Sequence, residues 1–263
     1  MSSRSSGRKL RTEGERVQKV LANTGLASRR EIDRLIQAGR IVIDGRPAIP
    51  GDRLTGTEKV FVDGRQIRLP DRSTAAANDV LMYHKPVGEI TTRRDPEGRP
   101  TVFDALPKPA RGRWITIGRL DINTSGLLLL TTDGTLAHRL MHPSYQVERE
   151  YAVRVRGQLN ESQLHAITTG VTLDDGPAKF ESVLPMQGGK SNSWYQVLLL
   201  EGRNREVRRV FEAVGCTVSR LMRVRYGPIN LGRLARGKYR YLERAEAERL
   251  YQTVADATEP ATS

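Results

Sequence analysis

Cysteine is almost absent from this chain of 263 residues, in which Cys216 is the only one. A single thiol cannot close an internal disulfide, and it cannot be the centre of a zinc cluster. No run of about 18 apolar residues occurs, which argues against a membrane-spanning helix. The first 11 residues are rich in Ser and Arg and lack the apolar stretch of a secretory signal. These absences predict a protein of the cytoplasm without a membrane partner.

Acidic residues are also in short supply, with 30 Asp and Glu against 43 Lys and Arg. The net charge is +13, and the basic residues are eight Lys and 35 Arg. Such an excess favours a polyanionic partner, because Lys and Arg displace counterions from phosphates and Arg forms a bidentate fork with them. A genome that prefers Arg codons would give the same composition. Hydrophobic residues at 38% indicate a folded protein of one or two domains.

The first part of the chain reads as a small helical and hairpin module over residues 14–68, after a basic disordered tail over 1–13. Apolar residues at helical spacing predict one helix ending at Gly25 and a second ending at Gly39. Ser28 and Glu31 have the spacing of a capping box at the start of the second helix. Asp44-Gly45 after a short strand over 41–43 predicts a hairpin turn, and the segment 60–64 repeats this pattern.

Residues 69–78 read as a linker, and residues 79–252 as a second domain in which strands outnumber helices. Several strands follow one another without a helix between them, which predicts an α+β fold with a mainly antiparallel sheet. Strands are expected at 80–83, 114–117, 127–131, 151–155, 180–185 and 194–200. Helices are expected at 136–141, 161–168, 205–214 and 244–254. The last residues, 253–263, are expected to be disordered.

Arginines cluster at the start of the second helix of the module. Arg29 and Arg30 stand where unpaired backbone amides already favour phosphate, with Lys19 and Arg40 nearby. A solvated helix face would have the same charges. The run "QKVLANTGLASRREIDRLIQAGRIVIDGRPAIPGDRL" resembles the S4 RNA-binding domain over residues 15–65. The resemblance implies that Lys19, Arg29, Arg30 and Arg40 contact RNA, reading its shape and phosphates more than its sequence.

In the second domain, chemistry centres on a polar turn at 118–126 between two apolar strands, and Asp121 is its one carboxylate. Such an Asp often only caps its own backbone. Ser125 has no evident histidine partner, which leaves a hydrolytic triad unsupported. His138 and His142 have the spacing of metal ligands but lack a third one, so no metal site is expected.

The sequence "GRLDINTSGLLLLTTDG" at residues 118–134 closely resembles the signature of the ribosomal RNA pseudouridine synthases. Three further segments match that family: "YHKPVGEITTRRDPEGRPTVFDALP", "RLMHPSYQVEREYAVRV" and "EGRNREVRRVFEAVG". The resemblance covers residues 15–250 and is strongest to the large-subunit synthase B group. It implies an isomerase that needs no cofactor and acts on 23S ribosomal RNA.

The resemblance also implies roles for named residues. Asp121 is the expected catalytic carboxylate, Tyr151 the active-site tyrosine and Arg208 the cation that pairs with Asp121. Arg119 would enter the space that a flipped base leaves, because a planar guanidinium can replace its stacking and hydrogen bonds. The remaining expected RNA contacts are Arg203, Asn204, Arg205 and Arg209.

Two other interpretations stay open at this point. One is an enzyme of the small-subunit branch, with 16S RNA as its target. The other is a non-catalytic RNA-binding factor of ribosome assembly, although the filled Asp, Tyr and Arg positions favour an enzyme. A monomer is the default expectation for the oligomeric state.

Overall fold

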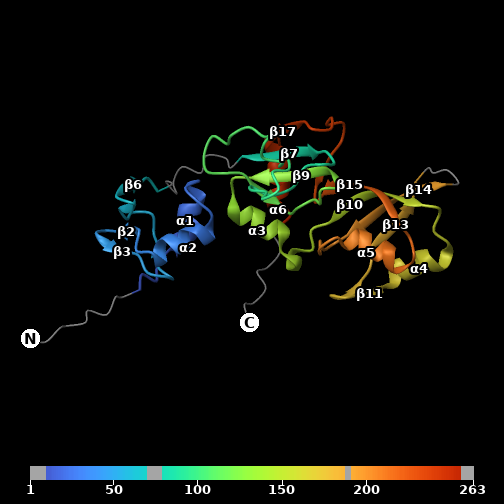
Figure 1. Cartoon of the computed structure of the whole chain (residues 1–263), viewed down its shortest axis with the longest axis horizontal. Helices are drawn as coiled ribbons and strands as arrows, with labels where there is room; N and C mark the ends of the chain where they lie inside the picture. The colour runs from blue at the N-terminus through green and yellow to red at the C-terminus, as the bar shows by residue number, and fades with distance from the viewer. Residues whose placement is uncertain (1–9, 70–78, 187–190, 256–263) are drawn as a thin grey trace, which may run out of the picture. The chain divides into compact units, whose positions relative to one another are not determined.

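The computed structural model describes residues 10–69, 79–186 and 191–255 (Figure 1). These residues form two compact units. The first contains residues 10–69 together with 108–114, and the second contains 79–107 and the chain from 115 onward. The predicted tails and linker lie largely outside the described residues. The short segment 108–114 was not expected in the first unit, because its sequence has no signal that separates it from the second domain.

The first unit pairs two helices with small sheets. Helices α1 (Val17–Asn23) and α2 (Arg29–Gln37) accompany a four-stranded sheet in the order β3-β2-β5-β6 and a two-stranded one, β1-β4. The strands are β1 (Glu15–Arg16), β2 (Ile41–Ile43), β3 (Arg46–Pro47), β4 (Arg53–Leu54), β5 (Val60–Val62) and β6 (Arg65–Ile67). Apolar faces of both helices and of β2 and β5 form its core.

Local signals in this unit act much as the sequence suggests. The Ser28 hydroxyl accepts a hydrogen bond from the backbone N–H of Glu31 at 3.1 Å, as an N-cap should. The reciprocal half of the capping box is absent, because the Glu31 carboxylate accepts from Arg34 instead. Asp44 and Gly45 both have positive φ, at 47° and 80°, which is the geometry of a type I′ hairpin turn.

The second unit is built on a nine-stranded sheet with the main order β13-β14-β10-β15-β9-β7-β17. Its pairs are antiparallel except for β15 with β9, which confirms the predicted α+β fold. The strands are β7 (Val80–Lys85), β8 (Ile115–Ile117), β9 (Ser125–Thr131), β10 (Arg149–Arg156), β13 (Ser182–Pro185), β14 (Asn192–Leu199), β15 (Val218–Tyr226), β16 (Ile229–Asn230) and β17 (Tyr239–Tyr241). A separate hairpin joins β11 (Val171–Leu173) and β12 (Gly176–Ala178).

Helices cover this sheet in two groups (Figure 1). The helices are α3 (Gly134–Met141), α4 (Glu161–Thr169), α5 (Glu206–Ala213) and α6 (Arg244–Gln252), with a 3-10 turn at Pro143–Tyr145. Helices α3 and α6 pack on a core drawn from β7, β9 and β15. Val254 is 2% exposed within that core, so ordered packing extends beyond the predicted end of the domain at 252. None of the helices in the described part of the chain has the length and apolar composition of a bilayer crossing.

Candidate active site

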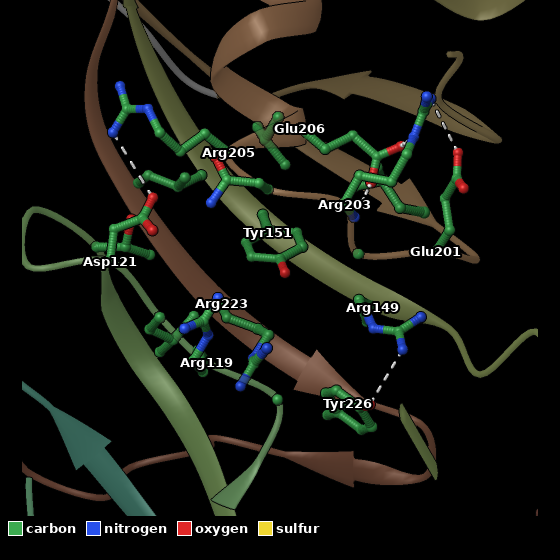
Figure 2. Close-up of a pocket in the computed structure, with 18 of the residues that line it drawn as sticks. Arg119, Asp121, Arg149, Tyr151, Glu201, Arg203, Arg205, Glu206, Arg223 and Tyr226 are labelled. Atoms are coloured by element: carbon green, nitrogen blue, oxygen red, sulfur yellow. Dashed lines mark hydrogen bonds and ion pairs between the residues drawn. The ribbon is translucent and has the colours of Figure 1, made fainter. Parts of the chain in front are cut away.

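A cavity of about 480 Å³ opens in the second unit (Figure 2). Its walls come from three places: the loop between β8 and β9, the strands β10 and β15, and the loop that leads into α5. Segments far apart in the sequence therefore meet here. Of the predicted residues, Arg119, Asp121, Tyr151, Arg203, Asn204 and Arg205 all line it.

The loop that carries Asp121 is held by hydrogen bonds from Lys85, the last residue of β7. Lys85 is fully buried, and its ammonium donates to the carbonyl oxygens of Asp121 at 3.0 Å, Thr124 at 2.9 Å and Pro86 at 3.0 Å. Burial lowers the pKa of Lys85 to about 8, while the Glu89 and Asp121 carboxylates oppose this shift. The Asp121 side chain itself remains 36% exposed and lines the cavity. Sequence reasoning missed Lys85, although a lysine at the end of the apolar run "VLMYH" is a usable signal.

Glycine in the same motif permits a close approach of two strands. Gly126 has φ of 108°, and a Cβ atom there would lie 2.2 Å from the carbonyl oxygen of Arg223. No other residue could therefore occupy this position without moving β9 away from β15. This approach sets the loop of Asp121 against β15.

The cation in contact with Asp121 is Arg205, and not Arg208 as predicted. An Nη atom of Arg205 lies 3.7 Å from the carboxylate, whereas Arg208 donates to the carbonyls of Asn123 at 2.9 Å and Val218 at 3.1 Å. The reason is where α5 begins. Arg205 is the residue directly before the helix, has a left-handed φ of 49° and is exposed, while Arg208 lies on the buried face.

Arg208 still acts on Asp121 through its charge. Burial and the neighbouring Arg205 lower the pKa of Arg208, and the Asp121 carboxylate opposes that shift. Arg208 also ties the loop of Asp121 to α5, because one of its acceptors is the Asn123 carbonyl. Among the described residues, the carboxylate thus has Arg205 in contact and Arg208 as a second cation, buried in α5 and outside the cavity lining.

Tyr151 lies on β10 and faces the cavity, with 9% of its surface exposed (Figure 2). Beyond it, Tyr226 packs against two guanidinium groups, those of Arg149 and Arg223, each 5.0 Å from the ring centre. Arg149 is fixed by the carbonyls of Val147 and Leu200, both at 2.8 Å. Sequence reasoning did not assign Arg149 or Tyr226 to this site, since an arginine in a strand is usually read as solvated and a tyrosine there as part of the core.

Two of the predicted phosphate contacts are engaged in ion pairs within the protein. Arg203 reaches Asp175 and Glu201 at 3.2 Å, and Arg209 reaches Asp175 at 2.8 Å. RNA that binds them has to compete with these carboxylates. Arg119 and Asn204 are exposed beside the cavity and have no such competitor among the described residues.

The predicted contacts of the first unit divide in a similar way. Arg40 forms a two-pronged pair with Asp63, both distances being 2.6 Å, and Lys19 pairs with Glu15 at 2.6 Å. Arg29 and Arg30 are exposed at the start of α2 and make no ion pair with the described residues. No group of three metal-ligating side chains occurs in the described ranges either.

Comparison with known proteins identifies the class to which this architecture belongs. Residues 79–213 match the RNA pseudouridylate synthase family, and residues 15–60 match the S4 domain. The chain belongs to the RNA pseudouridylate synthase family and carries an S4 domain ahead of the matched region. This confirms the family predicted from the sequence.

Comparison with individual proteins shows which members of the family this chain is similar to. A protein of Salmonella typhimurium named ribosomal large subunit pseudouridine synthase B is 55% identical over 239 residues, which are 90% of this chain and 82% of that one. The proteins of the same name in Escherichia coli K12 and Pseudomonas aeruginosa are 54% and 51% identical over 243 residues. The match covers 83% of the Escherichia protein but only 63% of the Pseudomonas protein. Among solved structures, a pseudouridylate synthase crystal structure gives a TM-score of 0.62 at 26% identity, covering 90% of this chain and all of that one.

Proposed function

We propose that this chain converts uridine to pseudouridine in the ribosomal RNA of the large subunit. The observation that carries the proposal is the setting of Asp121. Its partly exposed carboxylate lines a cavity, lies 3.7 Å from Arg205, and shares that cavity with Tyr151. The identity of 51–55% to proteins named large subunit synthase B supports the choice of RNA.

The reaction needs few groups. The bond between C1′ and N1 of the uridine breaks, the uracil rotates, and a bond forms between C1′ and C5. A proton leaves C5 and N1 gains one, so the atoms balance without an oxidant or cofactor. Ionised Asp121 would attack C1′ or C6, or remove a sugar proton, and these three routes stay open. Arg205 and Arg208 stabilise the negative charge on Asp121 in each of them.

The other cavity residues would hold the flipped nucleotide. The Tyr151 ring offers a face on which the uracil can stack. Arg119 is exposed and lines the same cavity, and it would enter the duplex position that the base leaves. The S4 unit would dock on the same RNA through Arg29 and Arg30. We expect the protein to work as a monomer in the cytoplasm, where ribosomes are assembled.

Asp121→Asn tests the catalytic proposal. The amide keeps the size and hydrogen bonding of the side chain and removes its charge, so pseudouridine formation on unmodified ribosomal RNA should fall below detection while RNA affinity stays within about twofold. Asp174→Asn, a change at an exposed aspartate outside the cavity, is the matched control and should keep full activity. Measurable turnover by Asp121→Asn would remove Asp121 from its proposed role.

Mapping of pseudouridine in cells that lack the gene tests the target. The proposal expects the loss of a modified position in 23S RNA. Loss of a 16S position instead would assign the protein to the small-subunit branch. Full retention of every position, with binding intact, would favour the RNA-binding assembly factor.

A further inference from the structure

A second basic surface lies outside the cavity, on the segment that joins β16 to β17. Arg233, Arg236 and Lys238 are all exposed, and none makes an ion pair with the residues that the structure describes. Tyr239 follows directly and is 39% exposed. We call these four residues the edge patch. The reaction at Asp121 makes no use of them.

The patch is exposed because it lies at the edge of the sheet. Strand β17 is the last strand of the main sheet order and pairs only with β7 within it. Side chains alternate along a strand, and Arg240 turns toward α6, where it pairs with Glu246 at 2.6 Å. Tyr239 therefore lies on the face of the strand that α6 does not cover, beside three cations that form no ion pair within the described part of the chain.

The patch is anchored next to the Asp121 loop. Nδ1 of His84 lies 2.7 Å from the Leu234 carbonyl, which can only accept, so the ring donates from this nitrogen. The backbone of His84 also bonds Gly237 and Lys238, at 2.8 and 2.9 Å. The next residue along β7 is Lys85, which holds the Asp121 loop. His84 and Lys85 thus fix the segment before β17 and the Asp121 loop, respectively, at the same end of β7. The segment before β17 can be followed in Figure 1.

We propose that the edge patch binds unpaired ribosomal RNA that flanks the target uridine. Exposed cations without internal partners suit phosphates, and an aromatic ring between them suits a stacked base. When the target base is flipped out, the neighbouring nucleotides need contacts with the protein. A surface that is fixed beside the Asp121 loop can provide these contacts. The choice of ribosomal RNA as the partner rests on the function proposed above.

Neutralising the three cations of the edge patch tests the part of the proposal that concerns phosphate binding. In R233Q/R236Q/K238Q, the Kd for unmodified 23S RNA should rise about tenfold or more near 150 mM salt. The salt slope, which is the slope of the logarithm of the binding constant against the logarithm of the salt concentration, should become shallower by about 2, or about 0.7 for each phosphate that is no longer neutralised. The control R156Q/R244Q/R249Q removes three other exposed arginines of the same unit and should change both values much less. Equal effects of the two triple variants would overturn the proposal, because only the net charge would then matter.

Tyr239→Ala tests the stacking half. Loss of one base stack should weaken binding by about five- to a hundredfold, and Tyr239→Phe should restore it, because the ring is retained. Tyr241→Ala is the matched control. That tyrosine lies on the same face and is 45% exposed, but it is two residues further along the chain from the three cations, so its removal should have little effect. Unchanged binding in Tyr239→Ala would exclude the stack.

Kinetics separate this inference from the proposed function. The patch variants should raise KM and leave kcat near that of the wild type at saturating RNA. A fall in kcat with an unchanged KM would overturn the docking role. If the wild-type protein makes no pseudouridine, the proposed function fails, while the direct binding measurements still decide for or against the patch.

Discussion

At the scale of single residues, two arginines one helical turn apart serve Asp121 differently. Arg205 contacts the carboxylate from an exposed position with a left-handed backbone. Arg208 is 8% exposed and donates to two carbonyls, one of them in the Asp121 loop. The first supplies charge at the carboxylate that we propose to react, and the second supplies both charge and structure.

Substitution should separate these roles. Arg208→Gln leaves two carbonyls without their charged donor, so the free energy of unfolding should fall by about 2–4 kcal/mol, together with activity. Arg205→Gln should lower kcat by about tenfold or more while changing the free energy of unfolding by less than about 0.5 kcal/mol. Urea denaturation and single-turnover kinetics measure the two effects. Equal destabilisation by both changes would contradict this division.

At the scale of elements, the loop that leads into α5 is held by a buried acid. Glu206 is 3% exposed and accepts from the backbone N–H of Arg203 at 2.9 Å. Burial and then a hydrogen bond to Glu201 raise the pKa of Glu206 to about 7. The folded protein therefore binds this proton more tightly than the unfolded chain does.

The sign of the resulting pH dependence follows from that difference. Between about pH 4.5 and 7 the folded state holds more protons at Glu206, so the free energy of unfolding should decline as the pH rises, by about 1–3 kcal/mol in all. Glu206→Gln imitates the protonated acid and should flatten this part of the profile. Urea denaturation at pH 5 and at pH 7.5 measures it, with Glu161→Gln as an exposed control. An unchanged slope in Glu206→Gln would assign the dependence to another group.

At the scale of the whole molecule, the net charge of +13 is not uniformly available to RNA. Several predicted contacts are already paired with acids, among them Lys19, Arg40 and Arg203. Arg29 and Arg30 have no such competitors among the described residues. The net charge therefore overstates the number of basic groups that are free to bind RNA, and we expect Arg29 and Arg30 to contribute more than the paired residues.

Two double variants of the S4 unit test this view. R29Q/R30Q should weaken RNA binding and lower the salt slope by about 1–2, with kcat retained at saturating RNA. K19Q/R40Q removes the same charge but takes it from existing ion pairs, so its slope should change less. Filter binding across a range of salt concentrations compares them. A larger loss in K19Q/R40Q would place the docking surface elsewhere on the unit.

Much of the fold follows from local signals. The Asp44-Gly45 turn and the Ser28 half of the capping box need only their own neighbours, and both occur, whereas the half expected from Glu31 does not. Strand β15 was missed because three arginines interrupt its apolar pattern. One of them, Arg223, is 2% exposed, since it donates to the Leu127 carbonyl and stacks on Tyr226. Leu127 lies 96 residues away in the chain, so this hydrogen bond leaves no local signal in the sequence around Arg223.

By itself, the sequence determined the family, the division into an S4 unit and a catalytic unit, and the turn that carries Asp121. Those properties depend on motifs whose residues are close together in the chain. Only the tertiary structure decided that Arg205 contacts Asp121, that Lys85 supports its loop, and that residues 108–114 join the first unit. Each of these depends on distances between segments that folding brings together, and the range of a hydrogen bond or ion pair is only a few ångströms.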